Sequence, residues 1–385
     1  MSPKNPGPGE LGKPRLGRIT LPTEQVGGGA RVVDTPTFMP VGTQGTVKGI
    51  LPAQLAAAGV QMILCNTYHL LKRPGDELLK KLGGLHRFMN WSGGIITDSG
   101  GFQVFSLAKR CKVDDQGVTF QHHVDGTSIR LDPQTAMQIQ CNIGSDIAMV
   151  LDECPALPAP REQIEKAVRR TVDWAQKSRA FLRQQQAAGQ HFPLAFAICQ
   201  GGTAVDLRLQ CQSALNELDF PGYALGGFAV GEPAEESYQV VSQVSSHMPW
   251  EKPRYLMGVG TPSDLVHYVG MGMDLFDCVM PTRNARNGQL FTSRGTLSIG
   301  NARFREDPLP LDPACACVAC TQYSRAYLRH LFLGKEILSS VLNSIHNITF
   351  YQDLMRQARQ AIASGTYADF AARFFELQKE NGSAL

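Results

Sequence analysis

Short apolar segments alternate with longer polar segments along most of the chain. The short segments are rich in β-branched residues and bounded by turn residues, which is typical of strands. The longer segments, such as Arg161–Gln186 and Thr203–Leu218, have the length and apolar spacing of helices that cross over between parallel strands. The expected strands are Pro36–Val41, Val60–Cys65, Gly94–Thr97, Ile147–Leu151, Leu194–Cys199, Gly222–Leu225, Arg254–Met257 and Asp274–Val279. A doubly wound open sheet has the same alternation, so the strand count favours a (β/α)8 TIM barrel.

Polar residues follow these apolar segments with unusual regularity. A single polar residue after a strand often only caps a helix or begins a loop. The set as a whole contains four carboxylates, two amides and a glycine pair, and in a parallel barrel all of them open onto one face, where active sites form. Its members are Asn66, Asp98, Asp152 with Glu153, Gln200, Gly226 with Gly227, and Asp277.

Length and charge narrow the class of protein only modestly. With 385 residues and 43% hydrophobic content, the chain can bury one large α/β domain with an appendage, or two ordinary domains. The formal net charge of +3 requires any nucleic-acid contact to come from a local basic patch. No apolar run is long enough to span a bilayer. The Gly- and Pro-rich stretch Met1–Pro14 lacks the apolar core of a secretory signal, so residues 1–14 are expected to form a flexible N-terminal extension.

Most of the ten cysteines stand alone within apolar segments, which indicates reduced, buried thiols and a cytoplasmic protein. Cys315, Cys317 and Cys320 depart from this pattern because they crowd into six residues. Three thiolates and one imidazole would complete a tetrahedral zinc site, with His346 as the fourth ligand and His330 as its competitor. A closed set of four ligands leaves no position for water, so the Zn²⁺ would be structural. It would attach an expected helix at 322–333 to the three-cysteine turn.

Four motifs in this sequence resemble those of the bacterial-type tRNA-guanine transglycosylases. They are Thr97–Gln103 (TDSGGFQ), Gln200–Gly202 (QGG), Gly226–Glu232 (GGFAVGE) and Asp277–Gly288 (DCVMPTRNARNG). The likeness runs from about Leu16 to about Phe375, and the spacing of the zinc ligands also matches. It implies a single TIM-barrel domain over 15–385, with a zinc-binding subdomain at about 300–350 near the C-terminal end. It further implies a homodimer that binds the anticodon loop of tRNA and exchanges guanine at the wobble position, position 34, for 7-aminomethyl-7-deazaguanine in the queuosine pathway.

The reaction requires a carboxylate that attacks C1′ of the ribose while the glycosidic bond breaks, giving a covalent intermediate. The resemblance makes Asp277 this nucleophile. It makes Asp98 the group that protonates the leaving guanine, later takes a proton from the incoming base, and lies against the bound base.

A guanine-like base presents N1–H and N2–H₂ donors beside an O6 acceptor. By resemblance, Asp152 would accept from the donors, while Gln200 and the backbone N–H of Gly227 would bond O6. The target base must leave its stack, and packing against Phe102 and Met257 offsets that cost. The remaining polar residues of the motifs, Asn66 and Gln103, would orient Asp277 or the ribose.

The last motif begins a stretch, Met280–Phe304, that contains four arginines and no acidic residue, which suits contact with phosphates. The resemblance assigns Arg283 and Arg286 to the anticodon loop. It also makes Cys154 and Val230 the residues that select the incoming base, with Val230 favouring the small aminomethyl base over queuine. The carbonyl of Phe228 would accept from the ammonium of that base, although a leucine is commoner at this position.

Four other functions are compatible with parts of the pattern. A non-catalytic partner subunit of a transglycosylase heterodimer would keep the barrel and zinc but lack the pair Asp98 and Asp277, both of which are present. An archaeal-type relative would carry a further C-terminal RNA-binding domain. A barrel hydrolase acting on free nucleosides or glycosides would use two carboxylates but leaves the arginines and the zinc ligands unexplained. A queuine-salvaging transglycosylase is the nearest alternative within the family.

Overall fold

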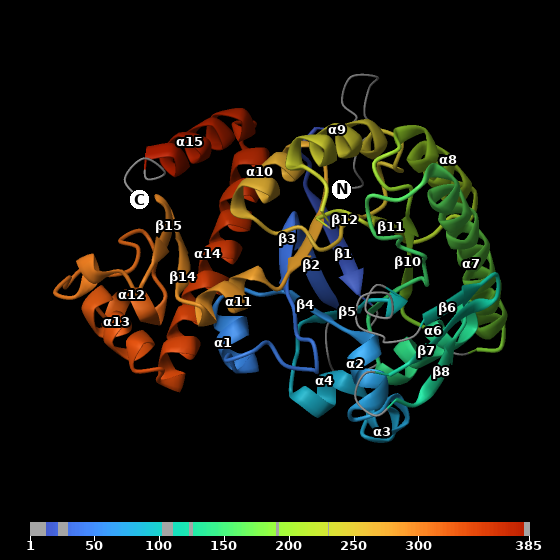
Figure 1. Cartoon of the computed structure of the whole chain (residues 1–385), viewed down its shortest axis with the longest axis horizontal. Helices are drawn as coiled ribbons and strands as arrows, with labels where there is room; N and C mark the ends of the chain where they lie inside the picture. Colours follow the sequence, from blue (N-terminus) through green and yellow to red (C-terminus); the bar gives the residue numbers. More distant parts are fainter. Residues whose placement is uncertain are drawn as a thin grey trace.

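The computed structural model describes residues 13–21, 30–101, 111–122, 126–189, 192–229 and 231–380, with side chains up to residue 378. Its centre is a sheet of eight parallel strands in the order β3-β13-β12-β11-β10-β9-β5-β4 (Figure 1). The sheet closes on itself, because Val41 after β3 bridges to Leu64 of β4 and the N–H of Gly42 donates to the carbonyl of Leu64 over 2.7 Å. The expected TIM barrel is therefore confirmed.

All eight strands form where the apolar segments predicted them. Their bounds are β3 (Thr37–Pro40), β4 (Met62–Cys65), β5 (Gly94–Thr97), β9 (Ile147–Met149), β10 (Leu194–Cys199), β11 (Gly222–Leu225), β12 (Arg254–Leu256) and β13 (Leu275–Cys278). Side chains that point into the barrel fill it as a packed core, with Met39, Phe196 and Tyr255 almost fully buried.

Helices surround this sheet and bury their apolar sides against it (Figure 1). They are α1 (Pro52–Ala57), α2 (Thr67–Lys72), α3 (Asp76–Lys81), α4 (Gly84–Met89), α6 (Pro133–Ile143), α7 (Arg161–Ala187), α8 (Val205–Glu217), α9 (Ala234–Ser245), α10 (Pro262–Gly270), α14 (Ile337–Ala363) and α15 (Tyr367–Glu380). The helices α7 and α8 confirm the two predicted crossovers within two residues at each end. None of the described helices has both the length and the apolar composition that crossing a membrane would require.

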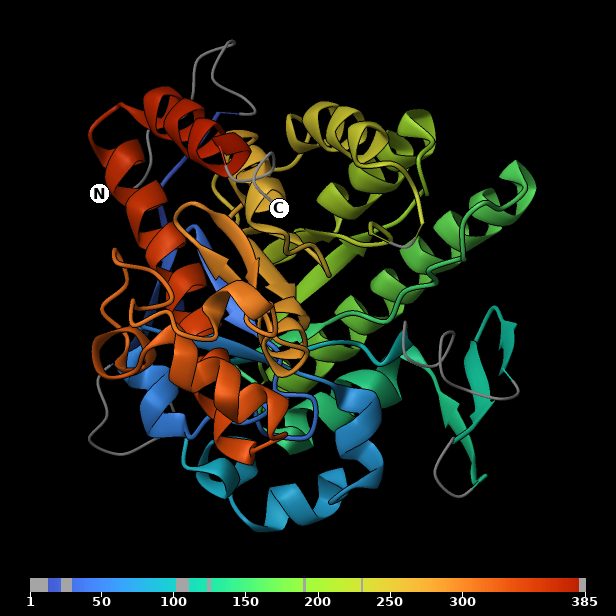
Figure 2. The same ribbon diagram turned by 60° about the vertical axis from the view of Figure 1, so that its left-hand side comes forward.

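Two small antiparallel sheets flank the barrel. The hairpin of β1 (Gly17–Leu21) and β2 (Arg31–Thr35) packs Ile19, Leu21 and Val33 into the core of the barrel. It lies at the amino ends of the strands, where Leu21 is so close to Gly94 that a side chain at Gly94 would clash. The other sheet, β6 (Cys111–Asp114), β7 (Gly117–Gln121) and β8 (Ser128–Leu131), stands out from the barrel in Figure 2. The hairpin leaves the carboxyl ends of the strands as the open end of the barrel.

A compact subdomain follows β13 and lies to one side of the barrel (Figure 1). Its elements are α11 (Met280–Arg286), β14 (Gln289–Thr292), β15 (Gly295–Ser298), the 3-10 turn η1 (Ala302–Phe304), α12 (Val318–Gln322) and α13 (Arg325–Leu333). The long helix α14 joins it to the barrel, because Asn347 donates to the carbonyls of Pro281 and Gln289 while Gln352 donates to that of Phe38 in β3.

One expected helix of this subdomain differs from the prediction. The segment 322–333 is not continuous, because Tyr323 is extended and Ser324 starts a new helix by accepting a hydrogen bond from the N–H of Tyr327 over 3.2 Å. The domain bounds and the flexible extension over 1–14 stay predictions, since only Lys13 and Pro14 of that extension lie among the described residues.

Candidate functional site

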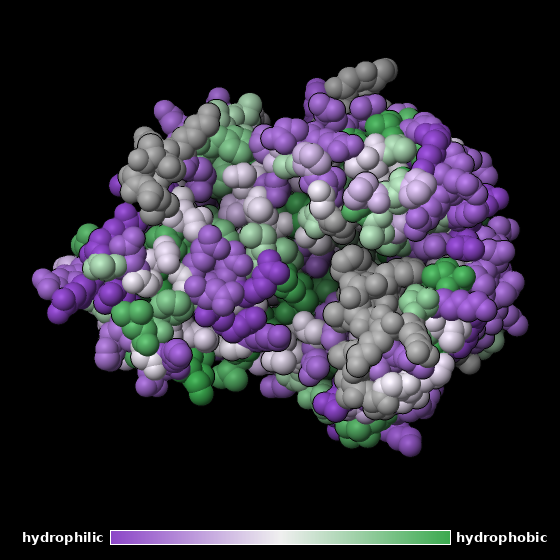
Figure 3. Space-filling view, viewed as in Figure 1, coloured by the Kyte–Doolittle hydropathy of each residue, from purple (hydrophilic) through white to green (hydrophobic). Residues whose placement is uncertain are grey.

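Six polar positions from different strands come together at the carboxyl end of the barrel. Asn66, Asp98 and Gln200 follow their strands directly, Asp152 follows β9 after two residues, Gly227 follows β11 after one residue, and Asp277 is the penultimate residue of β13. The side chains of Asn66, Asp98, Asp152, Gln200 and Asp277 are all less than 9% exposed. Figure 3 shows the molecular surface hollowed over the centre of the barrel. Carboxylates this deeply buried are costly unless they are hydrogen-bonded, so their partners indicate what each one does.

Asp277 is held by two donors on the neighbouring strand β12 and the loop after it. Its Oδ1 accepts from the hydroxyl of Tyr255 over 2.6 Å and from the N–H of Gly258 over 2.7 Å. No donor in the described part of the chain bonds Oδ2, so that oxygen has lone pairs available for attack. Burial raises the pKa of Asp277, and the two hydrogen bonds oppose this rise.

Asp98 is held by a different set of donors. Its Oδ1 accepts from the N–H groups of Thr67, over 2.9 Å, and Gly100, over 3.2 Å, and its Oδ2 accepts from the side-chain amide of Asn66. Burial raises the pKa of Asp98 to about 6, and the charge of Asp277 adds to the rise, while these donors oppose it. The two carboxylates are therefore near enough to influence one another's protonation.

The hydrogen bonds show which carboxylate each neighbour holds. Asn66 was expected to orient Asp277 or the ribose, and in this structure its amide donates to Asp98; its contact with the ribose stays a prediction. The residue that orients Asp277 is Tyr255, which the motifs did not single out. A tyrosine inside an apolar barrel strand is a signal in itself, since a buried hydroxyl requires a hydrogen-bond partner.

Asp152 and Gln200 form a second hydrogen-bonded unit next to the glycine pair. The Nε2 of Gln200 donates to Asp152 over 2.7 Å, and Ser99 donates to the other carboxylate oxygen over 3.1 Å. Burial raises the pKa of Asp152 to about 6, with a contribution from the charge of Glu153. A Cβ on Gly226 or Gly227 would lie 2.7 or 2.8 Å from the amide of Gln200, so only glycine fits at either position. The structure thus brings together the three positions that were assigned to the polar edge of the base.

The other residues assigned to the base are distributed as follows. Met257 is half-buried against the barrel core, and Phe228 is buried in the loop after β11. Cys154 is buried with its sulfur 3.3 Å from the position that a Cβ on Gly227 would occupy, and burial raises its pKa to about 12. Three assigned residues lie outside the described part of the chain, namely Phe102, Gln103 and Val230.

The predicted zinc ligands converge in the subdomain. One ligand atom each from Cys315, Cys317, Cys320 and His346 lies within 4.8 Å of the others. The Nδ1 of His346 faces the sulfurs of Cys320 and Cys317 at 3.3 and 3.7 Å, while its Nε2 is 2.8 Å from the carbonyl of Phe291. A proton on Nε2 that is donated to this carbonyl leaves the lone pair of Nδ1 for the metal. The cluster fits a structural Zn²⁺ with His346, not His330, as the fourth ligand.

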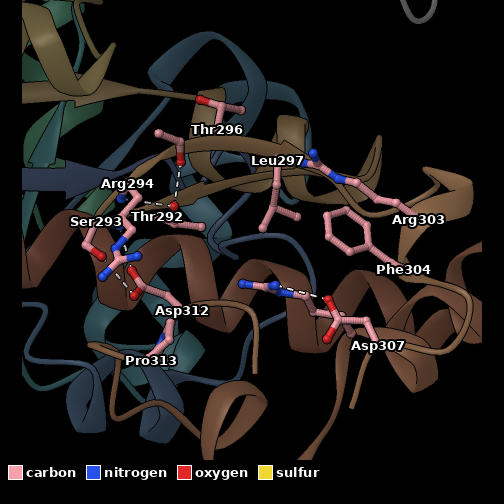
Figure 4. A pocket seen from close by; sticks show the side chains of 12 residues that line it. Thr292, Ser293, Arg294, Thr296, Leu297, Arg303, Phe304, Asp307, Asp312 and Pro313 are labelled. Carbon is pink, nitrogen blue, oxygen red and sulfur yellow. Dashed lines mark hydrogen bonds and ion pairs between the residues drawn. The ribbon is translucent and has the colours of Figure 1, made fainter. Parts of the chain in front are cut away.

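The turn that carries the three cysteines is tied to the β14–β15 hairpin by one carboxylate. Asp312 accepts from the N–H of Ser293 over 2.6 Å, from its hydroxyl over 2.9 Å and from the N–H of Ala314 over 2.9 Å. Figure 4 shows Asp312 in the wall of a cavity of about 380 Å³, which Arg303 and Phe304 also line. Asp98, Asp152 and Asp277 do not line this cavity, so it is separate from the barrel site.

The two arginines assigned to RNA lie on α11, the helix that follows β13. Arg283 is exposed, whereas Arg286 is half-buried and its Nη1 has no hydrogen-bond partner among the described residues. The strand β13, which carries the buried carboxylate Asp277, is therefore followed by a short helix with an exposed cation, Arg283. Such an arrangement can place a phosphate next to the ribose that the carboxylate would attack.

Comparison with known proteins agrees with this geometry. The family model for queuine tRNA-ribosyltransferase matches residues 11–380. The chain is 51% identical over 361 residues to the queuine tRNA-ribosyltransferase of Desulforapulum autotrophicum, covering 94% of this chain and 95% of the relative. It is 49% identical to that of Solidesulfovibrio magneticus, covering 97% of both chains. It is 48% identical to that of Marinobacter nauticus, covering 97% of this chain and 96% of the relative. The chain belongs to the queuine tRNA-ribosyltransferase family.

Proposed function

We propose that this protein exchanges guanine at position 34 of tRNAs with GUN anticodons for 7-aminomethyl-7-deazaguanine, as a step of queuosine biosynthesis. The match over nearly the whole chain supports this enzyme class. The observation that carries the mechanism is the pair Asp98 and Asp277. These two buried carboxylates interact electrostatically but are held by different donors, so they are suited to different tasks.

In the first displacement, Oδ2 of Asp277 attacks C1′ of the ribose. The C1′–N9 bond breaks, its electron pair goes to the guanine, and an aspartyl-ribose ester forms. The hydrogen bonds from Tyr255 and Gly258 to Oδ1 hold the carboxylate so that its other oxygen points at the substrate. Asp98 in its protonated form supplies the proton that the leaving base takes up.

In the second displacement, the incoming base attacks the same carbon and releases Asp277 as a carboxylate. The base loses a proton to Asp98, which returns to its starting state, so the exchange needs no nucleotide cofactor and retains configuration. A pKa near 6 lets Asp98 both give and accept a proton at neutral pH.

The base would lie between Asp152 and the glycine pair. Asp152 accepts from N1–H and N2–H₂, and a carboxylate already bonded to Gln200 and Ser99 keeps its orientation. The second N–H of the Gln200 amide, together with the N–H of Gly227, donates to O6. Met257 would cover one face of the ring, and Phe102 is assigned to the other face by resemblance.

The 228–229 peptide would receive the aminomethyl group. Glu232 accepts from the N–H of Ala229 over 2.5 Å and from Ser237 over 2.8 Å. The N–H and C=O of a trans peptide point in opposite directions, so the carbonyl of Phe228 points away from Glu232. We assign this carbonyl to the ammonium of the incoming base, with Cys154 and Val230 limiting the space around it.

Arg283 and Arg286 are assigned to the anticodon loop, and the protein is proposed to act as a homodimer. Exposed apolar side chains gather where α13 leads into α14, and Ile337 is 82% exposed. A second copy of the chain would cover them. None of the ten cysteines, all of which lie in the described part of the chain, forms a disulfide, which supports action in a reducing cytoplasm.

The test is incorporation of radiolabelled guanine into an unmodified tRNA with a GUN anticodon. Asp277→Asn should abolish incorporation. Asp34→Asn, which changes an exposed carboxylate on the hairpin at the other end of the barrel, should not. Failure of folded, zinc-loaded wild-type protein to incorporate label would refute the catalytic proposal and favour a partner subunit. Unlabelled 7-aminomethyl-7-deazaguanine should compete better than queuine, and the reverse order would indicate a salvage enzyme.

A further inference from the structure

A fully buried arginine lies directly beneath the proposed base site. Arg208 is in the first turn of α8 and is 0% exposed. Its Nε donates to the carbonyl of Gly202 over 2.8 Å and its Nη1 to that of Cys199 over 3.0 Å, while Nη2 has no hydrogen-bond partner. No carboxylate in the described parts of the chain forms an ion pair with it. A buried cation without a counter-charge is destabilising, so a role beyond stability is needed to explain it.

Arg208 contacts three segments that carry assigned base-binding residues. Its two hydrogen bonds hold the turn on either side of Gln200. Its Nη2 lies 3.7 Å from the position of a Cβ on Gly227, and its charge opposes the rise that burial causes in the pKa of Cys154. Its guanidinium covers the ring of Phe228 at 4.1 Å from the ring centre. A cation over an aromatic face is a stronger interaction when both groups are out of water, as here.

The backbone around Phe228 needs such support. Gly227 has φ of 71°, and Ala229 has φ of 56°, a left-handed conformation that a residue with a side chain rarely adopts. The contact of Glu232 with Ala229 holds this segment from one side. The stack of Phe228 on Arg208 holds it from the other side. A segment that is strained between two anchors will sample other conformations when one anchor is removed.

We propose that Arg208 is a positioning residue that determines base specificity through Phe228. By fixing the ring, it orients the Phe228 carbonyl toward the ammonium of the incoming base. This inference rests on the proposed function. It predicts a selective effect, because a base without the aminomethyl group does not use that carbonyl.

The test uses the guanine incorporation assay with two competing bases, 7-aminomethyl-7-deazaguanine and 7-deazaguanine. These bases differ only in the aminomethyl group. Phe228→Ala keeps the backbone carbonyl and removes the ring face, and Arg208→Met removes the cation. Each should raise the ratio of the inhibition constants, aminomethyl base over 7-deazaguanine, about tenfold. The double variant should raise this ratio no further than the more affected single variant does, since both changes break the same contact.

Arg254→Met is the matched control. Arg254 is also 0% exposed and also lies over an aromatic ring, that of Trp250 at 5.3 Å, but at the amino end of β12. It should lower thermal stability without changing the ratio. Equal weakening of both bases, additive effects, or tighter binding of the aminomethyl base by Arg208→Met would each overturn the inference. Absence of guanine incorporation by wild type would instead refute the proposed function.

Discussion

Replacing Tyr255 by phenylalanine tests how the nucleophile is held. The hydroxyl of Tyr255 donates one of the two hydrogen bonds on Oδ1 of Asp277, and it is fully buried, so no water replaces it in the folded protein. The bond stabilises the carboxylate relative to the neutral acid. Removing it therefore raises the pKa of Asp277 further above its ordinary value, in the direction that burial already drives it.

The size of this effect follows from the energy of one hydrogen bond to a charged acceptor, about 1.5 to 3 kcal/mol. One pKa unit corresponds to about 1.4 kcal/mol, and the N–H of Gly258 remains bonded to the same oxygen. We expect a rise of about one unit. Because the attacking form is the carboxylate, the acidic limb of the kcat/KM profile should move about one unit to higher pH, and the rate at pH values well below this limb should fall about tenfold.

The assay is base exchange from pH 5 to 9 with wild type, Tyr255→Phe and the control Tyr223→Phe. Tyr223 is an equally buried tyrosine on the neighbouring strand β11, and its hydroxyl accepts from the backbone N–H of Phe220. The control should lose stability without moving the acidic limb. Asp98 and Asp277 titrate as an interacting pair, so the limb describes the pair. An unmoved limb in folded Tyr255→Phe would refute the role given to this hydroxyl.

Three further outcomes are expected. His346→Ala should lose most of the bound zinc, measured by elemental analysis, and should lower the midpoint of thermal unfolding, while His330→Ala, at an exposed histidine of the same subdomain, should do neither. Arg283→Ala should weaken tRNA binding and reduce the slope of log affinity against log salt by about one, unlike Arg169→Ala on the exposed side of α7. The pKa of Asp152 rises from 3.8 to about 6 on folding, so the folded protein binds more protons between these values and loses stability as pH rises through them. Asp152→Asn should therefore abolish base exchange yet stabilise the fold at pH 7.5 by up to about 3 kcal/mol, with little gain near pH 4; equal gains at both values would contradict this account.

The sequence by itself determined the barrel. Strands such as Leu194–Cys199 are buried on both faces, so they form short unbroken apolar runs whose ends are visible without any tertiary information. It also predicted which polar positions come together, because a parallel barrel places every residue that follows a strand at the same end. The three crowded cysteines identified the zinc subdomain for a similar reason, since ligands that are close in sequence are close in space.

Only the tertiary structure decided which of these residues are partners. Nothing in the spacing distinguished His346 from His330, and only the packing of α14 against Phe291 turns the Nδ1 of His346 toward the sulfurs. The pairing of Asn66 with Asp98, and of Tyr255 with Asp277, depends on which barrel strands are neighbours and how their ends are staggered. Such hydrogen bonds join side chains that are close in space but far apart in the sequence. No periodic pattern along the chain therefore reveals them.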